Sequence, residues 1–354
     1  MDFGIAGLIG ADSWKLVQRA EALGFSHAWF YDNPLFVSEL FVSMAAAAVQ
    51  TRTIRLGMGT AVPSVRIAPT LAGGLASLNQ LAPGRIDCGF GTGNTARSMM
   101  ARGPLKLDDM REYLRVVRGL MHGDIVEFDY EGAPRKMKFM HPAPGLVNVR
   151  DPITWHFSAM GPRSRRLAAE LGLNWINFLS GQPAALADVG DMLAQWRAQG
   201  RNAADCYTTA FTLGCVLAEG ERCDSPRAMA QAGPHVALVL QHLISMRDRI
   251  DLGSSLTPEL ARIAREYQRI YDAYQPADTR YMQLFRGHLM WVLPEEAHFI
   301  TGDLIRDISL TGTIDQLRAR IAELAAAGYR QLTVQLVPGQ EAALDDWARV
   351  IEGL

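Results

Sequence analysis

The stretch that decides the fold is IRLGMGTAVPSVRIAPTLAGGLASLNQLAPGRIDCGFGTGN, residues 54–94. Two short apolar runs, at 54–62 and 86–91, flank an alanine- and leucine-rich segment with helical spacing. This order predicts two parallel strands joined by a helix, with both carboxyl ends on the same side of a sheet. Both runs end in small residues, which allow another group to approach the backbone closely. We therefore expect Thr60, Ala61 and Val62 to form one rim with the segment from Gly91 to Asn94, and a ligand to bind there.

The composition indicates a globular protein with no excess of either charge. Hydrophobic residues make up 49% of the 354 residues, and 35 basic side chains nearly balance 37 acidic ones. The length allows one large α/β barrel or two ordinary domains, and the charge gives no reason to expect nucleic acid or an anionic membrane as partner. The amino terminus begins directly as a strand, and no apolar run approaches about 20 residues. We therefore expect no signal peptide, no membrane span and a cytoplasmic location.

The cysteines, histidines and short motifs predict neither a metal site nor a disulfide framework. The four cysteines are far apart and form no CxxC pair, and Cys88 lies in an apolar run that is expected in the core. No histidine stands at metal-ligand spacing from a carboxylate. GxSxG, P-loop and HExxH motifs do not occur, and the glycines of GFGTGN (89–94) have the wrong spacing for a dinucleotide fingerprint.

One helix-to-strand joint recurs along the chain. It reads AEALGFSHAWFYD at 20–32, AAELGLNWINFLS at 168–180 and AELAAAGYRQLTVQL at 322–336: a helix, a glycine and an apolar strand. Repeated joints of this kind favour right-handed β/α crossovers. The predicted strands number eight: 3–9, 27–32, 54–62, 86–91, 153–159, 175–179, 208–217 and 331–336. We therefore expect one closed barrel that spans residues 1–354.

Two insertions interrupt the rhythm, and two helix starts are marked by capping residues. Residues 127–150 predict a hairpin or extended loop, and residues 224–302 contain helical patterns at 226–248 and 257–274. Long excursions of this kind typically form lids or oligomer contacts. Asp12 is the predicted N-cap of a helix that ends at Leu23, and Thr313 with Gln316 predicts a capping box.

A turn after the fifth strand opens a helix with small residues and an arginine: Ser158, Ala159, Met160, Gly161, Pro162 and Arg163. The N–H groups at a helix start, a glycine and an arginine together form a cradle for an anion such as phosphate. The alternative is an ordinary β/α turn beside a solvated cluster of Arg163, Arg165 and Arg166.

Polar residues end two strands on the expected rim. Asp32 and Asn33 end the second strand, where they could bond the polar edge of a ligand or simply supply turn chemistry before Pro34. Asn94 could bind a ligand through its amide or begin a helix. Of the histidines, His156 is expected in the barrel core, and His288 and His298 are expected as exposed structural residues rather than as substrate contacts.

Taken together, these residues resemble the bacterial luciferase-like superfamily of flavin- and deazaflavin-dependent oxidoreductases. Three segments carry the resemblance and span most of the chain: GTAVPSVRIAPTLAGGLASLNQLAPGRIDCGFGTGN, SAMGPRSRRLAAELG and LTGTIDQLRARIAELAAAGYRQLTVQL. The resemblance implies a TIM (β/α)8 barrel whose insertions cover the carboxyl-terminal mouth, a homodimer, and FMN or the deazaflavin F420 across that mouth. It also implies a bulge near Thr60, Ala61 and Val62, often with a non-prolyl cis peptide, beneath the ring. A phosphate clasp at 158–163 and ring-side positions at Asp32 and Asn94 complete the implied site.

Two departures from the family pattern bear on the cofactor. Many F420-dependent members carry Asp-His after the second strand, where this chain has Asp32 and Asn33, and some carry a glutamate where this chain has Ser98. The resemblance therefore implies an FMN enzyme of the two-component monooxygenase type, with Asp32 and Asn33 at the catalytic positions. Reduced FMN would come from a separate flavin reductase, and O2 would oxidise a small molecule. The alternatives are F420-dependent hydride transfer and a flavin-binding protein without catalysis.

The second insertion offers side chains for an apolar or aromatic substrate: Phe285, His288, Met290 and Trp291.

Overall fold

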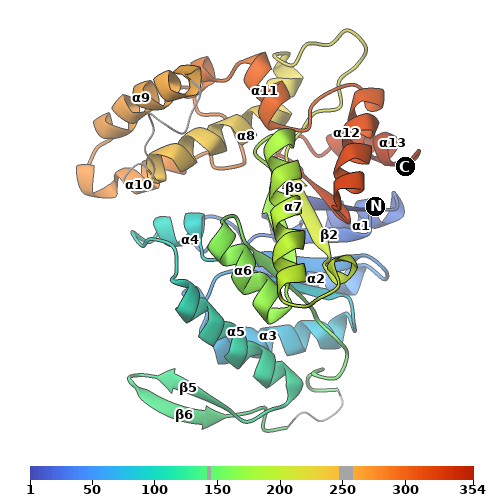
Figure 1. Ribbon diagram of the computed structural model, residues 1–354, viewed down its shortest axis with the longest axis vertical. Coiled ribbons are helices and arrows are strands. Elements are labelled where there is room, and N and C mark those ends of the chain that lie inside the picture. Colours follow the sequence, from blue (N-terminus) through green and yellow to red (C-terminus); the bar gives the residue numbers. More distant parts are fainter. Residues whose placement is uncertain (142–144, 247–257) are drawn as a thin grey trace. The chain divides into compact units, whose positions relative to one another are not determined.

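A closed barrel of eight parallel strands organises the chain. The computed structural model describes residues 1–141, 145–246 and 258–354 (Figure 1). Within them the barrel strands follow one another in the order β1-β10-β9-β8-β7-β4-β3-β2. The strands are β1 (Asp2–Leu8), β2 (His27–Phe30), β3 (Arg55–Ala61), β4 (Ile86–Phe90), β7 (Thr154–Ser158), β8 (Asn174–Phe178), β9 (Thr208–Thr212) and β10 (Gln331–Gln335). These are the eight predicted strands with slightly different ends, except that β9 stops at Thr212 rather than at residue 217.

Helices connect the strands, as the βα rhythm of the sequence predicts. The helices up to β9 are α1 (Trp14–Ala22), α2 (Leu40–Gln50), α3 (Ala68–Leu81), α4 (Asn94–Ser98), α5 (Leu107–His122), α6 (Pro162–Leu171) and α7 (Gln182–Ala198). After β9 follow α8 (Pro226–Ser245), α9 (Pro258–Ala273), α10 (Arg280–Leu284), α11 (Gly302–Ile308), α12 (Ile314–Ala327) and, after β10, α13 (Ala343–Ile351).

The chain divides into two compact units. The first unit comprises Asp2–Asn177 and Val189–Thr209, and the second comprises Met1, Phe178–Asp188 and Ala210–Leu354. In the first unit, β2, β3, β4 and β7 are parallel neighbours. Their carboxyl ends therefore share one edge, which confirms the predicted rim of the strands that end at Ala61 and Phe90.

The recurring joint owes its shape to a glycine at each helix end. Gly24, Gly172 and Gly328 have φ values of 87°, 62° and 119°. An L side chain rarely adopts these angles, whereas glycine does so without steric cost. Each glycine thus turns the chain from its helix into the following strand, as predicted.

The first insertion contains a hairpin, which is one of the two forms predicted for it. Strands β5 (Val126–Tyr130) and β6 (Ala133–Met137) pair antiparallel, and they follow α5 in Figure 1. Residues 142–144 of this insertion lie outside the described residues.

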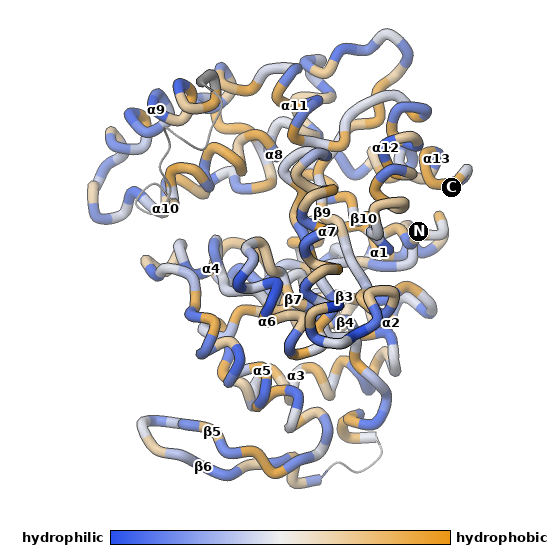
Figure 2. Tube along the Cα trace, viewed as in Figure 1, coloured by the Kyte–Doolittle hydropathy of each residue, from blue (hydrophilic) through white to orange (hydrophobic). Residues whose placement is uncertain are grey.

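The second insertion contains α8 and α9, which match the two predicted helical patterns; the predicted ends at residues 248 and 257 lie outside the described residues. Figure 2 shows α8 in orange over much of its length. Within the second unit, α8 packs its buried alanines and Val236 against Cys215 and Ile305. A hydrogen bond from the Gln335 side chain to the Leu289 carbonyl (2.6 Å) ties the insertion to β10.

The two predicted helix starts have different outcomes. At α12, Gln316 Oε1 accepts the N–H of Thr313 at 3.0 Å, which confirms the capping interaction. The predicted N-cap at Asp12 is wrong, because residues 11–13 already form a turn and Ser13 directly precedes α1. Asp12 instead pairs with Lys15.

Among the described residues, no helix combines the length and apolar character needed to cross a membrane. The same residues hold no group of three or more His, Cys, Asp or Glu side chains arranged to bind a metal ion.

Candidate active site

A bulge in β3 lies at the centre of the rim. The register of β3 against β4 shifts between Met58 and Ala61, and the peptide bond between Gly59 and Thr60 is cis. A non-prolyl cis peptide was expected near Thr60, and it lies directly before this residue. Thr60 is half-buried, and Ala61 and Val62 are buried.

Three glycines spaced two apart allow this bulge to pack against β4. A Cβ on Gly91 would stand 2.2 Å from Thr60 Oγ1, a distance that real Cβ atoms do not reach. A Cβ on Gly89 would meet the Met58 carbonyl oxygen at 2.5 Å, and one on Gly93 would meet Val62 Cγ1 at 2.5 Å. The small residues predicted to admit a close neighbour therefore admit the β3 bulge itself.

Asp32 is anchored to the segment that follows the bulge. Its side chain is 3% exposed, and Arg66 Nη1 donates to both of its carboxylate oxygens at 2.5 Å. The backbone N–H of Val62 donates to the same carboxylate. Asn33 is half-buried, and its carbonyl accepts the N–H groups of Phe36 and Val37. Its backbone thus closes the turn after β2, which the sequence offered as one of two roles.

Arg66 is a site residue that the sequence did not single out. Its Nη2 donates to Glu39, its guanidinium carbon lies 5.2 Å from the centre of the Phe41 ring, and its carbonyl accepts the Tyr113 hydroxyl at 2.9 Å. The signal that could have revealed it is its place just beyond β3, whose neighbouring strand β2 is followed by Asp32.

Burial sets the protonation behaviour of this pair. Burial raises the pKa of Asp32 above its ordinary value, and the nearby charge of Glu39 raises it further. The bonds from Arg66 and Val62 act in the opposite direction without restoring the ordinary pKa. The rim therefore carries a carboxyl group that takes up a proton more readily than a solvated aspartate.

The predicted anion cradle lies at the start of α6, at the end of β7. Pro162 is the first helical residue, and Ser164 Oγ both accepts the Gly161 N–H at 3.1 Å and donates to the Gly161 carbonyl at 2.8 Å. A Cβ on Gly161 would meet only Ser164 Oγ, at 4.0 Å, among the described residues. Arg163 is exposed. Open space at a helix start with an adjacent arginine fits a phosphate group.

The buried Arg165 holds this turn through hydrogen bonds. The alternative of a solvated arginine cluster is wrong for Arg165, which is 7% exposed. It donates to Asp191 at 2.5 Å and to the Met160 carbonyl at 2.7 Å. The carbonyl of the buried Ala159 accepts the indole N–H of Trp175 at 2.8 Å. Two side chains, Arg165 and Trp175, thus fix the backbone of the cradle. Ser158 is half-buried and Met160 is exposed.

Asn94 begins α4, directly after Gly93, whose φ is 79°. It is half-buried at the end of β4, on the rim where the sequence placed it.

The four substrate candidates of the second insertion lie in the second unit. Phe285, His288 and Met290 are buried, and Trp291 is 48% exposed. The expectation of an exposed His288 is wrong, because its Nδ1 lies 2.8 Å from Gln241 Oε1. His298 is exposed, as expected.

A buried carboxylate organises this region of the second unit. Glu296 accepts hydrogen bonds from Gln241 at 3.0 Å, from the Tyr267 hydroxyl at 2.6 Å and from the Leu293 N–H at 3.0 Å. Burial lowers the pKa of His288 to about 3, so its ring is neutral near pH 7. The network joins α8, α9 and the segment after α10 through buried polar contacts.

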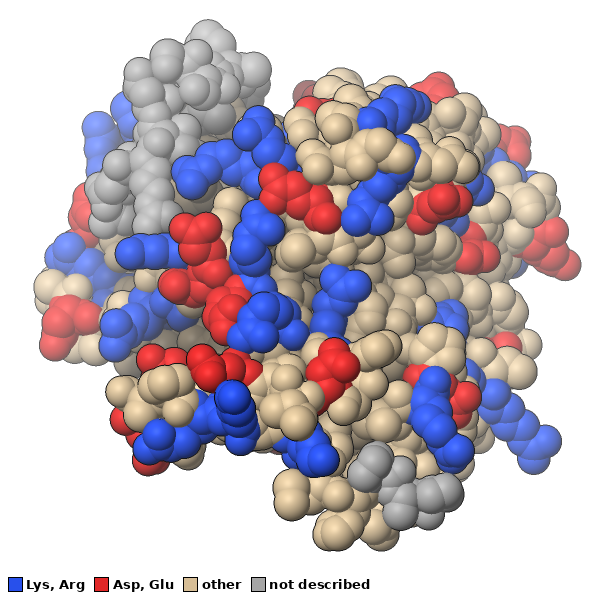
Figure 3. All heavy atoms as spheres, turned by 60° about the horizontal axis from the view of Figure 1, so that its bottom comes forward, with Lys and Arg blue, Asp and Glu red and all other residues tan. Residues whose placement is uncertain are grey.

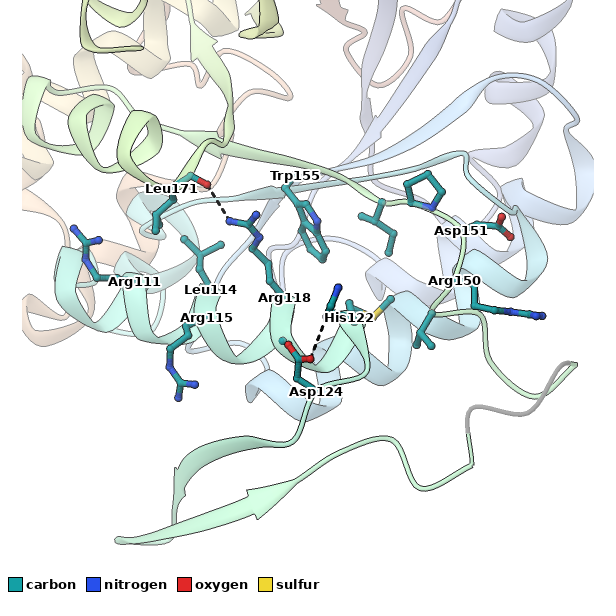
Figure 4. Close-up of a pocket in the computed structure, with 15 residues that line it drawn as sticks. Arg111, Leu114, Arg115, Arg118, His122, Asp124, Arg150, Asp151, Trp155 and Leu171 are labelled. Carbon is teal, nitrogen blue, oxygen red and sulfur yellow. Dashed lines mark hydrogen bonds and ion pairs between the residues drawn. The ribbon is translucent and has the colours of Figure 1, made fainter. Parts of the chain in front are cut away.

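A groove elsewhere in the first unit contains none of the predicted site residues. It has a volume of about 790 Å³ and lies between α5, residues 149–153 and Trp155 (Figure 4). Its arginines on α5 have partners within the protein: Arg111 pairs with Glu170, Arg115 pairs with Glu112, and Arg118 donates to the Leu171 carbonyl. Figure 3 shows basic and acidic side chains interspersed over the visible face, without a large patch of one sign. We assign no ligand to this groove.

Comparison with known proteins identifies relatives along most of the chain. A family model described as luciferase-like monooxygenase matches residues 11–331. The 5,10-methylenetetrahydromethanopterin reductase of Archaeoglobus fulgidus is 32% identical over 183 residues, about half of each chain (49% and 51%). The reductase of the same name from Methanolobus tindarius is 23% identical over 92% of this chain and 90% of its own. Limonene 1,2-monooxygenase of Rhodococcus erythropolis is 26% identical over 50% of this chain and 46% of its own.

Solved structures share the fold at low sequence identity. A coenzyme F420-dependent tetrahydromethanopterin reductase from Methanopyrus kandleri superposes with a TM-score of 0.69 at 19% identity, over 99% of this chain and 98% of its own. The oxygenating constituent of 3,6-diketocamphane monooxygenase from Pseudomonas putida, in complex with FMN, superposes with a TM-score of 0.62 at 15% identity, again over 99% and 98%. The family model spans nearly the whole chain, and this protein therefore belongs to the luciferase-like monooxygenase family.

Proposed function

We propose that this protein is an oxidoreductase that binds F420 at the rim of the first unit and transfers a hydride between F420 and a small organic substrate. One observation carries the proposal. The β3 bulge, the buried Asp32 and the open start of α6 all lie at the carboxyl ends of parallel neighbouring strands. This edge is where α/β barrels bind their ligands.

The chemistry of the residues present fits a phosphate-bearing flavin or deazaflavin. Thr60, Ala61 and Val62 would support the ring, and Asp32, Asn33 and Asn94 would face its polar edge. The phosphate would lie at the start of α6, against the residues that the sequence predicts: Ser158, Ala159, Met160, Gly161, Pro162 and Arg163. When bound, the cofactor supplies the hydride chemistry.

The protein's own residues hold and orient the reactants. Arg165 fixes the cradle through the Met160 carbonyl, and the glycines within and just after β4 allow the bulge to pack closely. Asp32 accepts the N–H of Val62 directly after the bulge and has a raised pKa, so it can hold or release the proton that accompanies hydride transfer. Contacts of Phe285, His288, Met290 and Trp291 with an apolar or aromatic substrate stay a prediction from the sequence.

Two features of the relatives support F420 as the first candidate. The reductase from Methanolobus tindarius matches over 92% of this chain, whereas the limonene monooxygenase matches over 50%. The solved reductase with the same barrel is named as F420-dependent.

A two-component monooxygenase is the second candidate. In it, a partner reductase would supply reduced FMN, and O2 would oxidise the substrate. Asn33 stands where many F420-dependent members have histidine, and Ser98 stands where some have glutamate. The solved diketocamphane monooxygenase, which is named with FMN, has the same fold.

Anaerobic titration of the purified protein with reduced F420 and with reduced FMN separates the candidates. The first predicts tight binding of F420 and no FMN-driven O2 consumption once air is admitted; the reverse pattern would establish the second candidate instead. Arg163→Ala is expected to weaken binding of the preferred cofactor by about tenfold, because a charge-assisted phosphate contact is lost. Arg166→Ala, an exposed arginine three residues further along α6, is the matched control and should bind normally. Binding of neither cofactor would refute both candidates.

A further inference from the structure

We propose that Arg66 is a positioning residue that couples the charge of Asp32 to the geometry of the segment after the β3 bulge, and thereby to cofactor binding. The inference rests on the proposed function, because it assumes that a flavin or deazaflavin lies on the bulge. Its mechanical part concerns contacts that the first unit shows without any ligand.

The first step is the convergence of three groups on one guanidinium. Arg66 donates through Nη1 to Asp32 at the end of β2 and through Nη2 to Glu39 before α2. Its guanidinium also lies over Phe41 in the first turn of α2. The Phe41 ring in turn occupies space at Gly74 of α3, where a Cβ would approach it to 2.3 Å. Arg66 is therefore enclosed on several sides, and its side chain is 13% exposed.

The second step is the anchoring of residues 62–66 at both ends. At one end, the Val62 N–H donates to Asp32, and the Val62 carbonyl accepts the Val65 N–H at 2.9 Å. At the other end, the Arg66 side chain binds the same carboxylate, and its carbonyl accepts the Tyr113 hydroxyl from α5. Asp32 thus closes a short loop of chain upon itself. A change at Asp32 or Arg66 therefore acts on Val62, which packs against Gly93.

In the third step, two carboxylates, Asp32 and Glu39, share one arginine. Asp32 is buried, whereas the Glu39 side chain is 49% exposed and also accepts the Val42 N–H at 3.0 Å. Tyr31, Tyr113 and Cys88 are further titratable groups near Asp32, and burial raises the pKa of each, so all three stay neutral near pH 7. Arg66 and Glu39 are therefore the charges that oppose each other at Asp32. Removal of either one shifts the proton affinity of Asp32, in opposite directions.

The experiment measures cofactor affinity as a function of pH in variants of these two residues, with reduced F420 and reduced FMN as probes. Arg66→Met removes the charge but keeps much of the apolar stem. It should weaken binding by about tenfold, the order of loss when a group that orients a binding residue is removed. It should also move the pH midpoint of binding upward, because Arg66 lowers the pKa of Asp32. Glu39→Gln should move the midpoint downward and keep the α2 cap, since the amide oxygen can still accept the Val42 N–H.

Two further variants separate positioning from general stability. Arg66→Lys keeps the charge without the planar fork, so it should restore the midpoint but only part of the affinity. Arg85→Met is the matched control, because Arg85 bonds Thr51 and the carbonyls of Ala48 and Ile54 away from the rim. It should lower the melting temperature and leave both affinity and midpoint unchanged.

A titration of the Asp32 carboxyl by NMR, without cofactor, keeps the inference distinct from the proposed function. Opposite shifts of this carboxyl in Arg66→Met and Glu39→Gln, together with the matching shifts in binding, support the proposal. Unshifted titration curves, or shifted curves with wild-type cofactor affinity in both variants, overturn it. If the wild-type protein binds neither probe, the proposed function fails first, and the coupling to cofactor binding fails with it even where the NMR shifts appear.

Discussion

The first unit buries two aspartates against arginines, one at each end of its strands, and the two carboxylates behave differently. Asp32 lies at the rim with Arg66, and Asp87 lies near the start of β4 with Arg55. Both side chains are at most 3% exposed. Yet the pKa of Asp32 is raised, whereas the pKa of Asp87 is lowered. Burial alone would raise both, so the difference must come from their partners.

The partners of Asp87 satisfy each carboxylate oxygen separately. His156 Nε2 lies 2.8 Å from Oδ1, and Arg55 Nε donates to Oδ2 at 2.7 Å. Arg55 also donates to the Gly84 carbonyl and to Thr154 Oγ1, and among the described residues no second carboxylate shares it. Arg66 instead divides its donors between Asp32 and Glu39. In this unit, the carboxyl whose arginine bonds no other carboxylate among the described residues has a lowered pKa, and the carboxyl whose arginine also bonds Glu39 has a raised pKa.

Replacement of the two aspartates tests this contrast most directly. Asp87→Ala leaves the buried His156 and the half-buried Arg55 without their carboxylate and should cost about 3–5 kcal/mol of unfolding free energy. Asp32→Ala should cost less, about 1–3 kcal/mol, because Arg66 keeps Glu39 as a partner. Urea denaturation of both variants measures the difference. Equal losses would show that the rim pair is as structural as the pair at the strand starts.

The pH dependence of stability should also differ in sign between the two ends. Near Asp87, burial lowers the pKa of His27 to about 4, and the charges of Arg55 and His156 add to this effect, while Asp87 and Asp2 oppose it. The unfolded chain therefore takes up a proton before the folded one, and stability falls as pH falls from about 6.5 to about 4. At about 1.4 kcal/mol per pH unit, the loss reaches about 3 kcal/mol. Asp32, with its raised pKa, contributes in the opposite direction: its stabilisation is present at low pH and lost as pH rises through the folded pKa.

His27→Phe checks this expectation. Phenylalanine keeps a ring beside Trp29 and Tyr207, and Ser26 Oγ retains its bond to the Phe3 carbonyl at 2.9 Å. The stability measured by thermal unfolding should fall less steeply from pH 7 to pH 4 in the variant than in the wild type. The difference in slope should correspond to about one bound proton. A slope identical to that of the wild type would remove His27 from the explanation.

The sequence predicted the features that depend on periodicity and on glycine. The alternation of helices and apolar runs located all eight barrel strands, and the glycines at 24, 172 and 328 marked the joints. Parallel strands have aligned ends, so the rim followed from the strand assignment alone.

The sequence did not reveal which polar side chains are paired. Arg66 lies 34 residues from Asp32, and a loop arginine has the same appearance in a sequence whether it is solvated or bonded. Arg165 was grouped with exposed neighbours for the same reason, although the helix turns it toward Asp191. His288 depends on Gln241, 47 residues away. Such pairs are made by tertiary packing, which local spacing does not encode.

Gly91, directly after β4, gives the test of the rim with the smallest expected effect. Gly91→Ala places a Cβ 2.2 Å from Thr60 Oγ1 and should cost about 1–3 kcal/mol, as overpacking typically does. Thr60→Ala removes the hydroxyl and leaves a nearest contact of 3.2 Å, so the double variant should recover much of the loss. Gly73→Ala in α3 is the control, because a Cβ there meets no atom of the described residues within 4 Å. It should be neutral or slightly stabilising, by up to about 1 kcal/mol.

Denaturation and cofactor titration of the same variants then decide what the close packing is for. If the packing shapes the ligand-binding surface, Gly91→Ala should lose cofactor affinity beyond its loss of stability, and Thr60→Ala in the same chain should restore both. Asp87→Ala, at the other end of the strands, should lose stability without a comparable change in affinity of the remaining folded protein. If both variants lost cofactor affinity in proportion to their loss of unfolding free energy, the two ends of the strands would differ only in the charge behaviour of their aspartates. Loss in Gly91→Ala alone would mean that the glycine at this position is a functional constraint on the bulge, imposed through its close contact with Thr60.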